Sequence, residues 1–283
     1  MTKQLINNIT ENLIHIAQVC PDGILVADLK GKIIIVNSSL QKMWSIAQDI
    51  FSNSDLKAIT NHFSKKTKSS DFSLPENTRN SSTEIELKNG KIFTMFCFSL
   101  KNAKGKKTGT VWFFHDVTKQ KQKEKKLAYD ALHDPLTKLA NRVLFNEALK
   151  ISLARAKRTA KKMALLYLDI DNFKRINDSF GHDVGDAVLA KFGKRLQSTV
   201  REDDFVARIG GDEFAIIVNN LAKIEDIDCV VTRIKQKVNG KYNIKRQVIS
   251  LKVSIGSSVY SDKCRNIPSL CKNADVALYV AKK

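Results

Sequence analysis

The chain has 283 residues, a net charge of +19 and a hydrophobic content of 43%. This length and hydrophobic content predict two domains with cores and argue against a disordered chain. No apolar run approaches the roughly 20 residues that a membrane span needs, and residues 1–18 lack the continuous apolar centre of a signal peptide, so we expect a cytoplasmic protein without a membrane span.

The positive charge is compatible with nucleic acid, an anionic lipid or a substrate made of phosphates. The basic residues are spread along the whole chain, and no nucleic-acid-binding motif is visible, so we expect no nucleic acid partner. The cysteines show no C-x-x-C spacing and are odd in number, which predicts neither a disulfide framework nor a zinc site. They are Cys20, Cys97, Cys229, Cys264 and Cys271.

Residues 1–117 have the pattern of a small α/β unit, with turn residues between apolar runs. Asn89-Gly90, the strongest short hairpin signal, lies inside the second pair of expected strands. The expected elements are two strands around Lys30-Gly31 within Gly23–Asn37, a helix over 39–51, a polar loop or irregular helices over 52–81, a hairpin over Ser82–Leu100, and a further turn and strand over 101–118.

This first unit resembles a PAS sensor domain. Asp22–Asn37 fits the pattern D-G-I-L-V-x-D-x-x-G-x-I-x-x-x-N, and His115–Thr118, "HDVT", matches the usual end of such a domain. The resemblance implies a sensor, but the sequence does not identify its ligand. His15, His62 and His115 are expected to be ordinary histidines rather than haem ligands.

Residues 118–133 form a charged segment with strong helix propensity, and Pro135 ends it. Leu127, Ala131 and Leu132 share one helical face. A charged helix between two domains is either a spacer or a signalling linker that pairs with its copy in a dimer.

Residues 134–283 predict the order helix, strand, helix, hairpin, helix, strand, helix. The first helix is expected over Asn141–Lys162, and the next over 173–197. Met163–Ile170 is a near-continuous apolar run, typical of a strand buried on both faces. Residues 203–218 predict a hairpin whose tight turn is made by Gly210 and Gly211, both with positive φ.

Acidic residues occur at the ends of two expected central strands. Asp169 ends one, and Asp212 with Glu213 begins another. If the strands are neighbours, these carboxylates meet at one edge of the sheet and repel one another unless a cation lies between them. Hard oxygen ligands suit Mg²⁺ (or Mn²⁺), which predicts phosphoryl or nucleotidyl transfer. The alternative, incidental surface acids, needs several acidic stretches to coincide by chance.

The acidic motifs resemble those of the diguanylate cyclase GGDEF domain family. The matching stretches are "GGDEF" at Gly210–Phe214, "LDIDNFKRINDSFGHDVGD" at Leu168–Asp186, "HDPLTKLANR" at His133–Arg142, "VSIGSSVY" at Val253–Tyr260 and "ADVALYVAKK" at Ala274–Lys283. The resemblance covers 134–283. It implies an α/β (α+β), palm-like fold related to class III nucleotidyl cyclases, and a homodimer that condenses two GTP into cyclic di-GMP with release of pyrophosphate.

The resemblance implies roles at the metal and the reacting groups. Asp169 and the Ile170 carbonyl hold Mg²⁺, and Glu213 is a further ligand. Asp212 takes part in metal binding and is the base for the ribose 3′-hydroxyl. Lys174 stabilises the phosphates at the transition state.

The resemblance also implies substrate contacts. The turn from Asp171 to Phe173 offers backbone N–H groups to the phosphates. Asn177 and Asp186 read the guanine edge, since an amide and a carboxylate complement its acceptor and donors. His182 either supports the structure or contacts the substrate, and Lys282 contacts the triphosphate.

Upstream of the glycine pair, Arg201 and Asp204 form an R-x-x-D motif. At this spacing it resembles the family's inhibitory site for the product, cyclic di-GMP, and Arg233 resembles the supporting arginine. Arginine suits phosphate and guanine. The alternative is a surface turn held by a salt bridge.

The sequence departs from the family at its two ends. Lys138 replaces a glycine and Ala140 a proline of the usual "LTGLPNR", which we expect to alter that turn. The family usually continues past "AK" with two residues and "GRN", whereas this sequence ends at Lys283. Either it is trimmed, or the protein ends early and we expect weaker GTP affinity and stability.

Three other functions are compatible with parts of the sequence. A non-catalytic receptor for cyclic di-GMP or GTP is the main alternative, although the complete acidic set argues against it. A phosphodiesterase is disfavoured because no room remains for its second domain. A DNA-binding regulator rests on net charge alone.

Overall fold

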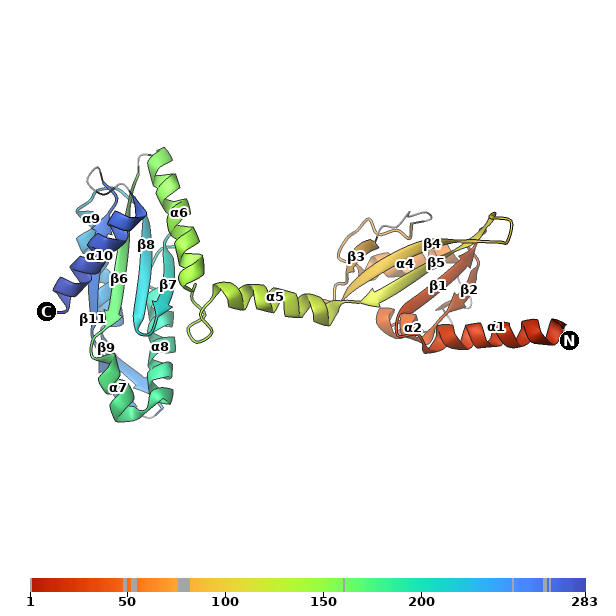
Figure 1. Ribbon diagram of the computed structural model, residues 1–283, viewed down its shortest axis with the longest axis horizontal. Coiled ribbons are helices and arrows are strands. Elements are labelled where there is room, and N and C mark those ends of the chain that lie inside the picture. The colour runs from red at the N-terminus through yellow and green to blue at the C-terminus, as the bar shows by residue number, and fades with distance from the viewer. Residues whose placement is uncertain are drawn as a thin grey trace. The chain divides into compact units, whose positions relative to one another are not determined.

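The computed structural model describes residues 2–47, 50–51, 55–75, 82–159, 161–245, 247–261, 264 and 266–283. The chain divides into two compact units, Met1–Lys126 and Leu127–Lys283 (Figure 1). The division falls within helix α5 (Thr118–Leu132). None of the helices in these described ranges combines the length and the apolar character that a membrane span requires.

The N-terminal unit is one antiparallel sheet with helices. Its strands lie in the order β2-β1-β5-β4-β3. The elements are α1 (Thr2–Val19), β1 (Gly23–Asp28), β2 (Ile33–Val36), α2 (Ser38–Trp44), α4 (Leu56–Lys66), β3 (Ser82–Glu86), β4 (Ile92–Lys101) and β5 (Lys107–Asp116).

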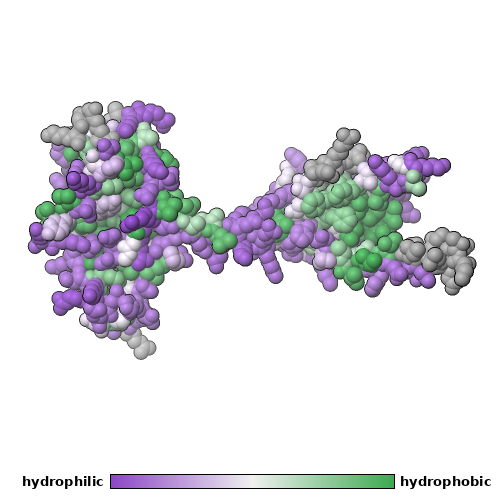
Figure 2. Space-filling model, viewed as in Figure 1, coloured by the Kyte–Doolittle hydropathy of each residue, from purple (hydrophilic) through white to green (hydrophobic). Residues whose placement is uncertain are grey.

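Aromatic side chains fill the core between the sheet and helices α2 and α4. Trp44 stacks on Phe63 with ring centroids 3.8 Å apart, and its ring meets Phe93 and Phe114 edge-on. Apolar side chains also reach the surface on the other face of the sheet (Figure 2). Phe96 and Phe98 of β4 are 39% and 44% exposed there. The alternation along β4 therefore places aromatic residues on both faces.

The strand predictions for this unit are confirmed, including the hairpin turn at Asn89-Gly90. The predicted helix over 39–51 ends earlier, at Trp44, because Ser45 adopts a left-handed backbone with φ 50°. Its residues 48–49 lie outside the described residues. The polar stretch over 52–81 contains the regular helix α4, while residues 52–54 and 76–81 lie outside the description.

The C-terminal unit has a central antiparallel sheet in the order β11-β6-β8-β7 and a separate β9-β10 hairpin. The elements are α6 (Arg142–Thr159), β6 (Lys162–Ile170), α7 (Phe173–Phe180), α8 (His182–Gln197), β7 (Phe205–Gly210), β8 (Glu213–Leu221), α9 (Asp226–Val238), β9 (Gly240–Ile244), β10 (Gln247–Leu251), β11 (Val253–Val259) and α10 (Ile267–Ala281).

Helices cover both faces of this sheet (Figure 1), which explains the near-continuous apolar run of β6. Leu166 and Leu168 face a cluster that includes Phe192 of α8 and Ile234 of α9. Leu165 faces a second cluster, formed with α6 and α10. Because successive side chains of a strand point to opposite faces, every position of β6 from Met163 to Leu168 is apolar.

Two predictions for this unit were wrong in detail, and one hairpin was missed. The single helix over 173–197 is two helices, because Gly181 takes φ 83° and ψ 159° between α7 and α8. The β9-β10 hairpin was not predicted. The tight turn consists of Gly211 and Asp212, since Gly210 pairs with Glu213, and only Gly211 of the two glycines has a positive φ.

Candidate active site

The predicted carboxylates meet at one edge of the central sheet. Strands β6 and β8 are antiparallel neighbours, and Asp169 stands directly opposite Glu213. Asp212 lies in the turn that leads into β8. On its other side Asp169 pairs with Ser254 of β11. The expectation that the two acidic strands are neighbours is confirmed.

The close approach of the three acids affects the protonation of Asp169 most strongly. Its side chain is buried, with the residue only 7% exposed. Burial raises the pKa of Asp169, the charges of Asp212 and Glu213 raise it further, and a hydrogen bond from Lys282 opposes them. The three acids are therefore close enough to repel one another, which favours a cation between them.

A lysine supplies positive charge at this edge. Lys282 Nζ lies 2.6 Å from Asp169 Oδ2, at the end of α10. Burial on its own lowers the pKa of Lys282, but the bond to Asp169 and the nearby acids outweigh it, so its pKa lies above the ordinary value. Lys282, predicted to contact the triphosphate, thus pairs with a predicted metal ligand.

The donor set fits a hard divalent cation. Carboxylate oxygens and backbone carbonyls are the ligands that Mg²⁺ and Mn²⁺ prefer, and the predicted ligand Ile170 follows Asp169 at the end of β6. Within the described ranges, no three His, Cys, Asp or Glu side chains are already drawn together as a metal site. Asp169, Asp212 and Glu213 would hold the ion after their side chains turn toward it.

The turn between β6 and α7 presents backbone groups beside the acids. Asn172 has φ 58°, in the left-handed region, and α7 begins after it. The N–H of Asp171 donates to the Lys252 carbonyl at 3.0 Å, and its carboxylate accepts from Ser254 Oγ at 2.7 Å. The Asp171 side chain and N–H are therefore used within the fold. In the described part of the chain the N–H groups of Asn172 and Phe173 donate no hydrogen bond, as the predicted phosphate contact requires. Lys174 is exposed in the first turn of α7.

The residues expected to read guanine lie on the packed pair α7 and α8. Asn177 of α7 is half-buried, whereas His182 and Asp186 of α8 are exposed. The amide oxygen of Asn177 lies against the backbone of Gly185, the residue before Asp186.

The three residues of the predicted inhibitory site line one cavity of about 400 Å³. Arg201 and Asp204 come from the segment after α8, and Arg233 comes from α9. Asp204 accepts from the backbone N–H of Arg201 and of Asn219, both at 3.0 Å, so its carboxylate holds the loop. Arg233 Nε is buried and has no hydrogen-bond partner among the described residues. The two guanidinium groups remain for a ligand.

A clamp on the Gly211-Asp212 turn was missed by the sequence reasoning. Arg208 Nη1 donates to both carboxylate oxygens of Asp134 at 3.0 Å, and its Nε and Nη2 donate to the Gly211 carbonyl at 3.0 and 2.8 Å. Burial on its own raises the pKa of Asp134, but hydrogen bonds from Thr137 and Arg208 outweigh it and hold the pKa below the ordinary value. The available signal was the acid of "HDPLT" together with an arginine before the glycines.

The turn around Lys138 keeps a glycine-like backbone despite the substitution. Lys138 has φ 62°, and its N–H donates to the Asp134 carbonyl at 2.9 Å. A non-glycine residue in this conformation costs about 1–2 kcal/mol.

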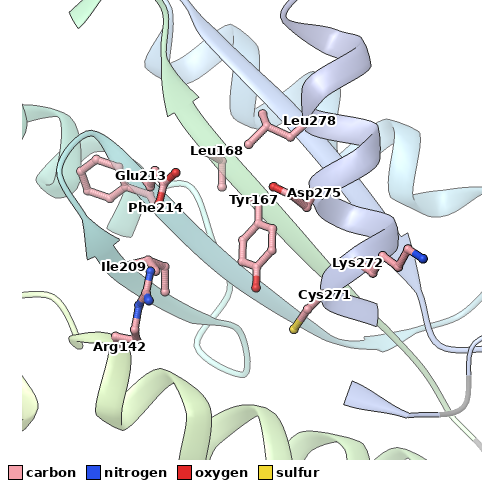
Figure 3. A pocket seen from close by; sticks show the side chains of 10 residues that line it. All are labelled: Arg142, Tyr167, Leu168, Ile209, Glu213, Phe214, Cys271, Lys272, Asp275 and Leu278. Carbon is pink, nitrogen blue, oxygen red and sulfur yellow. The ribbon is translucent and has the colours of Figure 1, made fainter. Parts of the chain in front are cut away.

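A cavity of about 350 Å³ lies on the α6 and α10 side of the sheet (Figure 3). Among the predicted site residues, Glu213 is the one that lines it. The Tyr167 hydroxyl and the Cys271 sulfur point toward one another there. Burial, and next a hydrogen bond with Cys271, raises the pKa of Tyr167. Tyr167 and Cys271 lie outside the motifs quoted in the sequence analysis, so their pairing could not be predicted from those motifs.

Comparison with known proteins identifies the family of the segment that contains these acids. The family described as "Diguanylate cyclase, GGDEF domain" matches residues 131–283. The bifunctional diguanylate cyclase/cyclic di-GMP phosphodiesterase MucR of Pseudomonas aeruginosa is 36% identical over 152 residues, 54% of this chain and 22% of MucR. The probable diguanylate cyclase DgcE of Escherichia coli is 35% identical over 179 residues, 63% of this chain and 16% of DgcE. The chain thus spans a minor part of these relatives.

Solved structures resemble the same part of the chain. The GGDEF domain of TpbB from Pseudomonas aeruginosa is 36% identical, with a TM-score of 0.51 over 53% of this chain and 88% of that one. The coiled coil and GGDEF domain of DgcB from Caulobacter crescentus, solved in complex with cyclic di-GMP, is 29% identical, with a TM-score of 0.53 over 59% of this chain and 88% of that one. The family match covers more than half of this chain, which therefore belongs to the diguanylate cyclase GGDEF domain family.

Proposed function

We propose that the protein is a diguanylate cyclase that condenses two GTP into cyclic di-GMP and releases two pyrophosphates. The observation that carries this proposal is the pairing of Asp169 with Glu213 across β6 and β8, with Asp212 in the adjoining turn. Membership of the GGDEF family, in which named relatives are diguanylate cyclases, supports it.

In the proposed reaction, the 3′-oxygen of each GTP forms a bond to the α-phosphorus of the other, and the bond to pyrophosphate breaks. Asp212 accepts the proton of the 3′-hydroxyl. Lys174 and the N–H groups of Asn172 and Phe173 balance the negative charge of the phosphates. A bound Mg²⁺ or Mn²⁺ supplies Lewis acidity to the phosphates. Asp169, Asp212, Glu213 and the Ile170 carbonyl would hold that ion.

The condensation requires a homodimer, because each protomer offers one carboxylate edge and binds one GTP. Lys282 has two roles in this scheme. Its Nζ pairs with Asp169 at 2.6 Å, and it would be available to the triphosphate when Asp169 binds a metal ion instead.

We also propose that the N-terminal unit is a PAS-like sensor. Its antiparallel sheet in the order β2-β1-β5-β4-β3, with α2 and α4 on one face, supports this assignment. Trp44 Nε1 is buried without a hydrogen-bond partner in the described part of the chain, so an acceptor on a ligand is one group that would satisfy it.

Product inhibition is proposed at the cavity of Arg201, Asp204 and Arg233. Two guanidinium groups facing one cavity suit the phosphates and guanines of cyclic di-GMP. Arg201→Ala is expected to raise the product yield at high cyclic di-GMP. Unchanged inhibition of this variant by cyclic di-GMP would contradict the proposal that the cavity is the inhibitory site.

The test of the catalytic proposal is incubation of the full chain with GTP and Mg²⁺ at a concentration where light scattering shows a dimer. Cyclic di-GMP, quantified by chromatography, is the expected product. A dimer that binds GTP or cyclic di-GMP but forms no product would instead be the non-catalytic receptor. The cavity of Arg201 and Arg233 favours that alternative, and the intact carboxylate edge favours the enzyme.

A further inference from the structure

Gly185 occupies a buried position in α8 that faces α7. The two helices are joined through Gly181 alone, whose carbonyl accepts from the N–H of Gly185 at 3.2 Å. The short connection brings the start of α8 against the middle of α7. Gly185 is therefore at the contact between the two helices that carry the predicted guanine contacts.

The Asn177 side chain fills the space that a side chain at position 185 would occupy. A Cβ built on Gly185 would lie 1.8 Å from Asn177 Oδ1 and 3.0 Å from its Cγ. The ring of Phe173 would follow at 3.3 Å. The separation from Oδ1 is far below van der Waals contact of about 3.5–4.0 Å, and the other two are slightly short of it. The observed orientation of Asn177 thus requires glycine at 185.

The side-chain amide of Asn177 is held in place by packing against Gly185 and by no hydrogen bond among the described residues. It makes no hydrogen bond with any residue in the described ranges. It is half-buried, and Asp186 follows Gly185 directly on α8. An amide beside a carboxylate offers donors and acceptors that complement the guanine edge.

We propose that Gly185 is a positioning residue for guanine recognition, because it lets the Asn177 amide lie against α8 beside Asp186. This inference rests on the proposed function of the domain as a GTP-binding enzyme. Gly185 itself touches no substrate in this scheme. Its contribution is to fix one amide before the substrate arrives.

Alanine at 185 separates recognition from folding. The atom that it overlaps most is the end of a flexible side chain, so Asn177 can rotate away. Alanine also favours a helix over glycine by about 1 kcal/mol. We therefore expect Gly185→Ala to fold, and to hold the Asn177 amide in a different orientation.

The experiment measures KM and kcat for GTP and ITP, which lacks the guanine 2-amino group, in the full chain. Gly185→Ala is expected to raise KM for GTP at least tenfold, with kcat changed less than threefold. The preference for GTP over ITP should fall by a similar factor, since a site built for a hydrogen bond discriminates strongly. Calorimetry with a GTP analogue carrying an α,β-methylene bridge gives the affinity without turnover.

Two controls identify the cause. Gly193→Ala adds the same methyl to α8, but against Leu139 and Thr137 at 3.2 Å, and should leave KM unchanged. In an Asn177→Ala background, Gly185→Ala should change KM less than twofold, because the amide is already gone. An equal effect in that background would overturn the inference.

The outcomes also separate this inference from the proposed function. If the wild-type chain forms cyclic di-GMP and Gly185→Ala keeps the wild-type KM and GTP preference, the positioning role is wrong and the enzyme stands. If no product forms but the methylene analogue binds with a Gly185-dependent affinity, the positioning role stands and the catalytic proposal fails.

Discussion

The carboxylate edge and the arginine cavity of the C-terminal unit handle charge in opposite ways. At the edge, Asp169, Asp212 and Glu213 repel one another, and Lys282 offsets part of their charge. In the cavity, Asp204 is already used by two backbone N–H groups, which leaves Arg201 and Arg233 facing the open space.

This difference indicates different ligands for the two places. Unbalanced carboxylates favour a metal ion, whereas unbalanced guanidinium groups favour phosphates. The contacts that stabilise the two places also differ. Helix α10 and the Arg208 clamp stabilise the carboxylate edge, whereas Asp204 joins the loop of the arginine cavity to β8. Changes can therefore be directed at one place without the other.

The largest effect is expected from Glu213→Gln, which removes one negative charge at nearly constant shape. We expect cyclic di-GMP formation to fall about 1000-fold, or about 4 kcal/mol at the transition state. Calorimetric affinity for cyclic di-GMP should stay within threefold. Glu147→Gln on α6, an exposed acid paired with Lys150, is the matched control. Activity of Glu213→Gln within tenfold of wild type would contradict the proposal that Glu213 is a metal ligand.

The converse change is Arg233→Ala in the cavity. Loss of one guanidinium should weaken cyclic di-GMP binding about 100-fold and move product inhibition to correspondingly higher concentrations. Isothermal titration calorimetry and inhibition curves measure this. Lys237→Ala, an exposed lysine one turn along α9, should bind like wild type. Equal affinities in the two variants would contradict the assignment of the cavity.

A smaller effect tests the support of the edge by α10. A Cβ on Gly256 of β11 would lie 2.1 Å from the Leu278 nitrogen and 2.3 Å from the Ala274 oxygen, both in the α10 backbone. Gly256→Ala must displace α10, so urea denaturation should show a loss of about 2–3 kcal/mol in unfolding free energy. Ser257→Ala, its neighbour, is the control. A loss below 0.5 kcal/mol would show that α10 moves freely.

The smallest effect concerns the Arg208 clamp. Asp134→Asn should lower the free energy of unfolding at pH 7 by about 2 kcal/mol, since it weakens a charged hydrogen bond to Arg208. The folded-state pKa of Asp134 lies below 3.8. Its stabilisation is therefore present above the ordinary pKa and lost as the pH falls through the folded value.

Denaturation curves of the Asp134 variant from pH 7 to pH 2 check the sign of this effect. The difference from wild type should shrink at the acid end. Asp130→Asn on α5, an exposed acid whose carboxylate makes no hydrogen bond among the described residues, should show no such trend. A difference that is constant with pH would contradict the clamp.

The sequence predicted the parts that depend on neighbouring strands and strong turn signals. Asp169 and Glu213 could be placed together because one apolar run ends in an acid and another begins with acids just after a glycine turn. It did not predict the break at Gly181, since the apolar periodicity continues on both sides of that residue. The turn was misplaced by one residue because two adjacent glycines fit it equally well before the register is known.

Contacts between segments that are distant along the chain could not be predicted from the sequence. Arg208 and Asp134 are 74 residues apart, and only the folded chain brings them together. Lys282 was expected at the triphosphate, but its bond to Asp169 depends on how closely α10 packs on β11 at Gly256. The orientation of Asn177 likewise depends on a residue that lacks a side chain.

The central claim is that the edge makes a product that the arginine cavity then binds. A single progress curve with GTP and Mg²⁺, recorded on the wild-type chain at a concentration where light scattering shows a dimer, tests it most directly. We predict that two GTP are consumed per cyclic di-GMP formed, and that the rate falls well before GTP is exhausted and recovers when the product is removed. A dimer that binds GTP and leaves it unconverted would contradict the account.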